Sequence, residues 1–267
     1  KPSVLSTYAD IAAAGYGDSL IAAQRLQSAI AALVDAPSAD ALQAAKTAWL
    51  AARGPYQQTE AYRFGNPIVD DWEGKVNAWP LDEGLIDYVD AAYGGPSDEN
   101  ALAALNVIAN RQITLSSGPV DASVITPALI EGALQEADGI EANVASGYHA
   151  IEFLLWGQDL NGHGPGAGNR PWTDYAVGDD PDAGIVAMLT GMGSMSYGEQ
   201  AGQRMRLGLM LNDPEEEHDC FSDNTHNSHY YDGLGVQNVY LGEYVRIDGT
   251  LVSGPSLSDL VEAVDPA

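Results

Sequence analysis

Cysteine and basic residues are scarce in this sequence, and both shortages exclude classes of site. Cys220 is the only cysteine among 267 residues, which excludes an intramolecular disulfide and any metal site built from several thiolates. Lysine and arginine number 11 against 38 acidic residues, a net charge of −27. Because such a surface repels nucleic acid and attracts cations, we expect no nucleic-acid partner. The charge is compatible with metal attraction and equally with an adaptation to solubility or salt.

Long hydrophobic runs are also missing. A membrane-spanning helix needs about 20 apolar residues, whereas the longest apolar stretch, residues 150–156, is interrupted by Glu152. We therefore expect no membrane span. The sequence begins at Lys1 without a charged segment and an apolar run behind it, so we expect that any secretion signal was removed or never present. The 45% share of hydrophobic residues still allows a sizeable core.

Helical spacing of the apolar residues dominates the chain and predicts an all-α fold. Ser38 is a candidate N-cap, and Gly54-Pro55 is expected to end or kink the helix that follows it. A short β-hairpin is predicted around Asp248-Gly249. The predicted helices cover residues 4–34, 39–53, 98–111, 126–136, 138–157 and 185–211, and a short one follows Ser256.

Two packed helical-bundle-like halves with long irregular connections fit this pattern. The stretch 115–121, with its Ser-Ser-Gly-Pro, is the candidate boundary, so we predict an N-terminal half over residues 1–117 and a C-terminal half over residues 118–267. Residues 65–96 are irregular but rich in aromatic side chains, which is unusual for a linker. Residues 212–232 are predicted to be polar and irregular.

Two polar residues on an apolar helix form the first candidate site. His149 and Glu152 stand three positions apart within residues 138–157, so they share one helix face and can reach one ligand. An imidazole nitrogen and a carboxylate oxygen suit Zn²⁺ or iron. A buried pair that satisfies only itself is the alternative. Because burying an unpaired carboxylate is unfavourable by several kcal/mol, their presence favours a role.

Two further groups of residues are candidates for completing such a site. Glu60 and Arg63 are also three positions apart, either as a surface ion pair or with Glu60 facing the His149 site. Asp82 is a further acidic residue that could complete the site, after Glu152 and Glu60. Residues 213–232 hold seven carboxylates and three of the five histidines, but they match no standard metal-binding spacing, so a polar loop with hydrogen-bonded histidines is the alternative.

Three blocks of the sequence resemble the imelysin family of bacterial cell-envelope proteins, also called peptidase family M75. Residues 147–159 contain the Gly147-x-His149-x-x-Glu152 pattern of that family. Residues 58–89 and 190–244 resemble the corresponding blocks of its iron-regulated branch. The resemblance implies two helical bundles with a site at their interface, and His149 and Glu152 as the motif pair. It also implies export to the periplasm or outer membrane, often with a lipid anchor on a removed N-terminus, and expression linked to iron supply.

The chain departs from the family pattern in one respect. Only about 30 residues separate Asp159 from Thr190, where the family is expected to have more helix, and residues 177–181 look like an abrupt junction. The chain also ends soon after Leu260, where another helix is expected. We expect either a shortened member or a sequence from which segments have been left out.

The residues and the resemblance together favour a non-catalytic protein that binds a metal ion, iron or zinc, or a small iron-containing ligand. The expected ligands are His149, Glu152 and Glu60. Two alternatives stay open: a zinc metallopeptidase, with a histidine from residues 213–232 as third ligand and Glu60 as base, and an interaction module for haem or siderophore uptake. The supporting candidates are Arg63, Asp82, His218, Asp219, His226 and His229.

Overall fold

The computed structural model describes residues 1–79, 81–86, 101–156, 189, 192, 196, 204–205, 210 and 217–264. Over these residues the protein is mostly helical with two small two-stranded sheets, which confirms the predicted fold class. The chain divides into two compact units, each assembled from segments far apart in sequence. Unit 1 comprises Lys1–Asp71, Pro171–Asp213 and Asn224–Ala267, and unit 2 comprises Trp72–Arg170 and Pro214–Asp223. The predicted division after residue 117 stays a prediction.

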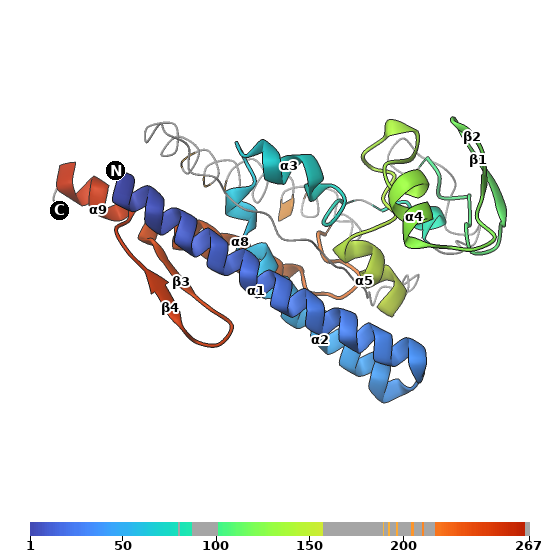
Figure 1. Ribbon diagram of the computed structural model, residues 1–267, viewed down its shortest axis with the longest axis horizontal. Coiled ribbons are helices and arrows are strands. Elements are labelled where there is room, and N and C mark those ends of the chain that lie inside the picture. The colour runs from blue at the N-terminus through green and yellow to red at the C-terminus, as the bar shows by residue number, and fades with distance from the viewer. Residues whose placement is uncertain are drawn as a thin grey trace. The chain divides into compact units, whose positions relative to one another are not determined.

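Two long helices, α1 (Pro2–Asp35) and α2 (Ala39–Gln57), pack side by side in unit 1 (Figure 1). The predicted cap is confirmed, because the Ser38 hydroxyl accepts a hydrogen bond from the backbone N–H of Ala41 at 3.1 Å. The predicted end of this helix near residue 53 is wrong, because α2 continues through Pro55 to Gln57. A proline so near the C-terminus interrupts only the last turn.

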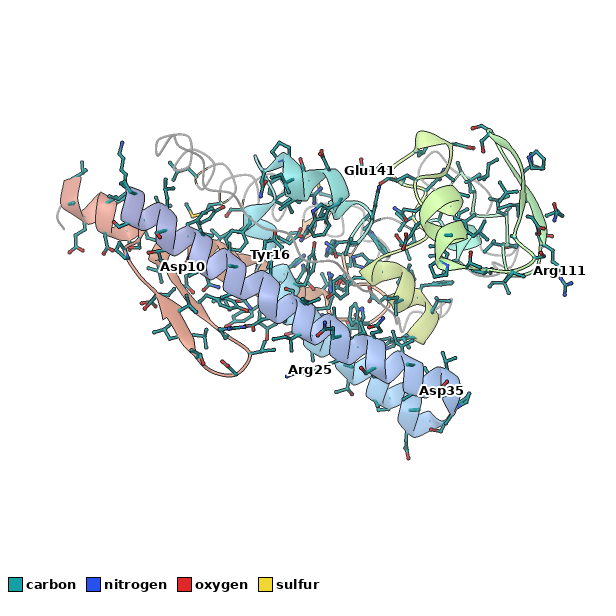
Figure 2. The ribbon with its side chains drawn as sticks, viewed as in Figure 1. Asp10, Tyr16, Arg25, Asp35, Arg111 and Glu141 are labelled. Carbon is teal, nitrogen blue, oxygen red and sulfur yellow. The ribbon has the colours of Figure 1, made fainter. Side chains whose placement is uncertain are left out.

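The apolar stripe of α1 faces the core of unit 1. Tyr16 is buried, whereas Asp10, Arg25 and Asp35 project from the exposed face of the same helix (Figure 2). Tyr16 and another α1 tyrosine, Tyr8, pack against the Tyr62 ring of η1 (Glu60–Tyr62), with centroids 6.0 Å and 5.3 Å away. The aromatic contacts tie α1 to the segment that carries Glu60.

The C-terminal part of unit 1 contains α8 (Thr225–Leu241), strands β3 (Glu243–Val245) and β4 (Leu251–Ser253), and α9 (Leu257–Val264). β3 and β4 pair antiparallel around Asp248-Gly249, which confirms the predicted hairpin, and α9 confirms the helix after Ser256. The prediction of irregular structure up to residue 232 is wrong from Thr225 onward. The polar start of α8 lacks an apolar stripe, and its buried Ser228 and Asp232 are polar, so periodicity could not reveal it.

Unit 2 contains mainly short elements. α3 (Pro67–Glu73) runs into it from unit 1. It also contains η2 (Glu83–Leu85), strands β1 (Gln112–Leu115) and β2 (Gly118–Asp121), α4 (Pro127–Leu129), η4 (Ile130–Leu134), η5 (Ala137–Gly139) and α5 (Tyr148–Trp156). The stretch predicted as a boundary is the tight β1–β2 hairpin, in which Leu115 pairs with Gly118. The predicted helix over residues 98–111 is wrong for its described part, residues 101–111, which form turns.

Two apolar clusters form the core of unit 2. One joins Leu85, Ile113 and Leu115 to Leu134, and the other surrounds Val144 and the buried face of α5. Among the described residues, no helix combines the length and the hydropathy needed to cross a membrane. Most of the helix predicted over residues 185–211 lies outside the described residues.

Candidate metal centre

A glycine fixes the start of the helix that carries the first two site residues. The helix predicted from residue 138 begins only at Tyr148, because Gly147 adopts φ +99° and interrupts it. A Cβ at Gly147 would stand 2.6 Å from the carbonyl carbon and oxygen of Val76, so only glycine fits there. The Tyr148 N–H then donates to the Val76 carbonyl at 2.7 Å. This close approach turns His149 and Glu152 inward, where both are 0% exposed.

Glu152 orients the imidazole of His149. One carboxylate oxygen, Oε2, lies 2.8 Å from His149 Nδ1, and the other, Oε1, accepts the backbone N–H of Ser222 at 2.8 Å. A carboxylate can only accept from a ring N–H, so this arrangement places the proton on Nδ1. The other ring nitrogen, Nε2, is therefore the one suited to bind an ion, in the carboxylate–histidine–metal pattern.

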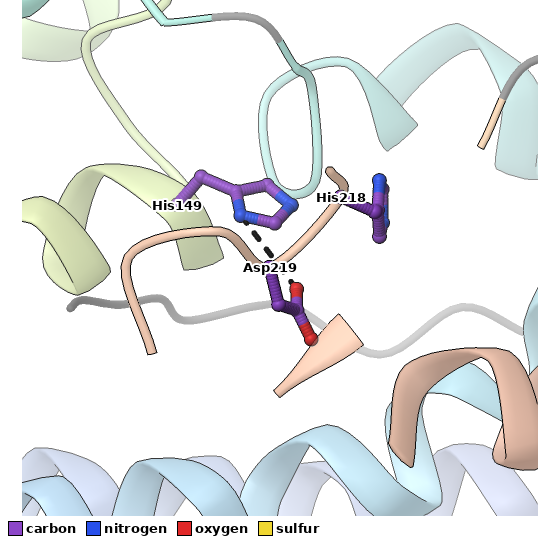
Figure 3. Close-up of side chains that lie close together, drawn as sticks. All are labelled: His149, His218 and Asp219. Carbon is purple, nitrogen blue, oxygen red and sulfur yellow. Dashed lines mark ion pairs between the residues drawn. The ribbon is translucent and has the colours of Figure 1, made fainter. Parts of the chain in front are cut away.

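The second segment of the site is the turn at residues 217–223, which brings His218 and Asp219 to His149 (Figure 3). Asp219 Oδ1 lies 3.8 Å from His149 Nδ1, and the rings of His149 and His218 meet edge to face with centroids 4.8 Å apart. Both side chains of the turn are buried, with exposed fractions of 5% for His218 and 0% for Asp219. One donor atom from each of the three residues lies within 4.8 Å of the other two.

An aromatic wall encloses this group of donors. The Trp79 ring meets the His149 ring edge to face at 5.1 Å, and Phe221 packs against both Trp79 and Phe153. Trp79 and Trp72 are both half-buried. The apolar surroundings lower the local dielectric response, so the Asp219 and Glu152 carboxylates need nearby positive charge more than exposed carboxylates do.

The donors fit a metal ion in type, and their spacing requires a modest contraction. Imidazole nitrogens and a carboxylate oxygen bind Zn²⁺ at about 2.0–2.2 Å, which puts tetrahedral donors about 3.4 Å apart. The donor atoms lie within 4.8 Å of one another, so binding an ion would require them to move closer together. Among the described residues, His149, His218 and Asp219 form the one group of this kind, and it includes neither Glu152 nor Glu60.

Glu60 lies in unit 1, in a different cluster of buried polar groups. Arg204 bridges two carboxylates there, with Nη2 2.7 Å from Glu60 Oε2 and Nη1 2.9 Å from Asp232 Oδ2. The Tyr56 hydroxyl donates to Glu60, and the Gln57 amide donates to Asp232 at 3.0 Å. The Glu60 carboxylate is therefore held by a cation and a hydroxyl in this cluster, and its coordination of a metal stays a prediction.

Burial perturbs the second acid of this cluster. Removal from water is the main cause that raises the pKa of Asp232 from 3.8 to about 8, and the negative charge of Glu60 adds to it. The guanidinium groups of Arg204 and Arg53 act in the opposite direction.

The remaining predicted site residues lie in unit 1 or elsewhere in unit 2. Arg63 pairs with Asp70 at 3.0 Å and stands 3.9 Å from Glu60 in unit 1. Asp82 is buried in unit 2 and accepts a backbone N–H from 20 residues further along at 2.6 Å. His226 is exposed and His229 half-buried on α8, which belongs to unit 1.

Sequence reasoning missed several polar residues of both clusters. Asn77 is buried, and its amide Nδ2 lies 3.4 Å from His218 Nε2. Arg204, which lies 144 residues beyond Glu60 in the sequence, contacts it directly. Asp232 lies 172 residues beyond Glu60 and is linked to it through the same guanidinium group. No local pattern marks such partners. The one usable signal was the excess of histidine and acid in residues 213–232.

Comparisons with known proteins place the chain among imelysin-like proteins. The family model described as imelysin, peptidase M75, matches residues 12–179 and 176–267. The two matches meet at residues 176–179, beside the junction predicted from the sequence, and those residues lie outside the described part of the chain.

Two relatives carry iron-related descriptions. Iron-regulated protein A of Synechococcus elongatus is 37% identical over 60 residues, which is 22% of this chain and 17% of that protein. A crystal structure from Parabacteroides distasonis, provisionally described as an iron-regulated protein A precursor, has a TM-score of 0.52 and 17% identity. It covers 97% of this chain and 78% of its own, and at this identity it supports the fold alone.

Proposed function

Since the chain belongs to the imelysin family, we propose that it is an iron-linked protein of the cell envelope that binds a metal ion at His149, His218 and Asp219. The observation that carries this proposal is the convergence of two imidazoles and one carboxylate, all buried, from two segments of unit 2. Two histidines and one carboxylate form a ligand set typical of Fe²⁺ sites with open positions and of zinc sites.

Glu152 supports the ligands without belonging to the set. Its hydrogen bond to His149 Nδ1 fixes the ring orientation and makes Nε2 more basic, which strengthens a bond from that nitrogen to a cation. The Ser222 N–H in turn fixes Glu152. A bound divalent cation would offset the charge of the two buried carboxylates, Glu152 and Asp219, which is a physical reason for an ion at this place.

The charge of the chain and the descriptions of its relatives agree with this role. A net charge of −27 raises the local concentration of cations around the protein. The relative from Synechococcus elongatus is described as iron-regulated, and the match spans only a small part of it. We therefore propose, as part of the same function, that the protein is exported to the periplasm or outer membrane and contributes to iron uptake there.

Calorimetric titration of chelator-treated protein tests the metal site. Zn²⁺, Fe³⁺ and, without oxygen, Fe²⁺ are titrated into the wild type, His149→Ala and His226→Ala. His226→Ala is the matched control, because it removes the imidazole of an exposed histidine and leaves His149, His218 and Asp219 in place. We expect one ion per chain, at least about tenfold weaker binding in His149→Ala, and no change in His226→Ala. Equal binding by all three proteins would end the proposal.

A zinc-dependent peptidase is the second candidate, because three protein ligands with an open position are also the pattern of catalytic zinc. Glu60, the base predicted for such a site, is held by the Arg204 guanidinium and the Tyr56 hydroxyl in unit 1. Incubation of the zinc-loaded protein with unfolded casein tests this candidate. Cleavage that chelator abolishes and that His149→Ala lacks would establish it, whereas no cleavage by the zinc-loaded wild type would remove it.

A further inference from the structure

A groove in unit 1 lies between three elements of the fold. It has a volume of about 520 Å³ and is bounded by α1, by α2 and by the turn between β3 and β4. That volume falls within the range of about 300–1,000 Å³ that is typical of small-molecule pockets. Its described lining residues all belong to unit 1, so the groove shares none of them with the proposed metal centre of unit 2.

Small apolar side chains form the floor of the groove. Ala44, Ala48 and Ala51 stand at positions i, i+4 and i+7 of α2, so they share one face of that helix. This row extends over about 10 Å of the helix. Ala22 lines the groove from α1. Because an alanine presents only a methyl group, the row leaves room for an apolar chain that lies along α2.

A buried ion pair fixes the third wall of the groove. Ile247 lines the groove from the turn between β3 and β4, and its backbone N–H donates to Asp18 Oδ2 at 3.0 Å. The neighbouring Arg246 donates from Nη2 to Asp18 Oδ1 at 2.7 Å. Asp18 is a fully buried residue of α1, so these bonds hold the turn against that helix. The width of the groove is therefore set by the fold of unit 1.

Among the described residues, Arg25 is the one charged side chain that lines the groove. It follows Ala22 by three positions on α1, and its side chain is exposed (Figure 2). Arg204 and Arg246 of the same unit pair with carboxylates. Arg25 forms no ion pair or hydrogen bond with any residue that the structure describes, although the chain has 38 acidic residues. Its guanidinium can therefore bind an anion from solution.

We propose that this groove binds a small amphiphilic anion, a carboxylate on an unbranched alkyl chain, independently of the metal site. The carboxylate lies on Arg25, whose guanidinium can hold it through two parallel hydrogen bonds. The alkyl chain lies along the alanine row, where it leaves water. The net charge of −27 repels anions from the surface in general. An alkyl carboxylate therefore needs a local unpaired cation, and Arg25 supplies one beside an apolar floor.

Three probes with one alkyl chain separate the head group from the chain. Decanoate, decanol and decyltrimethylammonium are titrated into the wild type in a calorimeter. We expect one decanoate per chain and at least about tenfold weaker binding of decanol, which lacks the charge-assisted hydrogen bonds to Arg25. The ammonium is attracted by the acidic surface as a whole, so its binding should not depend on Arg25.

Three variants at exposed positions assign the contacts. Arg25→Gln should weaken decanoate at least about tenfold and leave decanol unchanged. Ala44→Phe fills the floor of the groove and should weaken both probes. Arg111→Gln is the matched control, because it removes an exposed arginine of unit 2 that does not line the groove. We expect it to bind decanoate as the wild type does.

Three results would overturn the inference. Decanoate does not bind the wild type, or it binds Arg25→Gln as tightly as Arg111→Gln, or Ala44→Phe leaves its affinity unchanged. Circular dichroism checks that each variant is folded. The metal titration is a separate measurement on unit 2, so loss of decanoate binding and loss of metal binding can be told apart.

Discussion

Replacing Gly147 by alanine should damage the protein more than the loss of one glycine usually does. Gly147 combines a φ of +99° with a position where a Cβ would meet the Val76 carbonyl at 2.6 Å. Both the backbone conformation and the contact therefore oppose a side chain. Two other glycines of unit 2 separate these effects: Gly139 has φ +74° with open space around it, and Gly132 has open space without a positive φ.

The expected magnitudes follow from this series. Gly139→Ala brings only backbone strain and should destabilise the protein by about 1–2 kcal/mol. Gly147→Ala brings similar strain of about 1–3 kcal/mol and a clash with backbone of about 1–3 kcal/mol. Its total should thus be about 2–6 kcal/mol. Gly132→Ala, in η4, should stabilise the protein by about 0.5–1 kcal/mol because it restricts the unfolded chain.

Urea denaturation followed by circular dichroism measures all three free energies of unfolding, and the calorimetric zinc titration reports on the site. Because Gly147 fixes where α5 begins, its alanine variant should also bind Zn²⁺ more weakly, whereas the other two should bind like the wild type. A Gly147→Ala variant that is no less stable than Gly139→Ala would show that the Val76 contact has no energetic weight.

Two further predictions concern unit 1. Burial raises the pKa of Asp232 from 3.8 to about 8 in the folded state, so the folded protein keeps a proton that the unfolded chain releases. The stability that this proton contributes is complete below about pH 4 and is lost as pH rises to about 8. The free energy of unfolding of wild type minus that of Asp232→Asn should fall by up to about 1.4 kcal/mol per pH unit across that range; a difference that is independent of pH would contradict the raised pKa. Asp18 accepts hydrogen bonds from Tyr244, from Arg246 and from the Ile247 N–H at 2.7–3.1 Å. Asp18→Ala should therefore destabilise the protein by about 3–5 kcal/mol in urea melts, and a loss below about 1 kcal/mol would show that water replaces these bonds.

Local rules predicted the parts of the fold that local forces decide. The long α1, the Ser38 cap and the hairpin at Asp248-Gly249 depend on spacing and turn chemistry within a few residues. α5 was predicted ten residues too early, because Ile140 and Val144 continue the apolar spacing of the helix. The break at Gly147 arises from a contact with Val76, which lies far away in sequence.

The site residues, like the elements of the fold, could be predicted where their signal was local and not where it depended on long-range contacts. His149 and Glu152 could be recognised because their spacing on one helix is local. Composition alone could not show which histidine of residues 213–232 lies beside His149. In the structure the start of α8 divides these histidines into two groups. His218 precedes that helix and joins His149, whereas His226 and His229 lie on the helix itself. The contact of Asn77 with His218 spans 141 residues and has no signature in the sequence.

Anomalous diffraction from crystals soaked in Zn²⁺, with data on both sides of the zinc absorption edge, locates a bound ion without reference to any assay. We expect one strong peak about 2.0–2.2 Å from a nitrogen of His149, a nitrogen of His218 and an oxygen of Asp219. A peak bound only by other residues, or no peak in crystals that hold folded protein, would contradict this expectation.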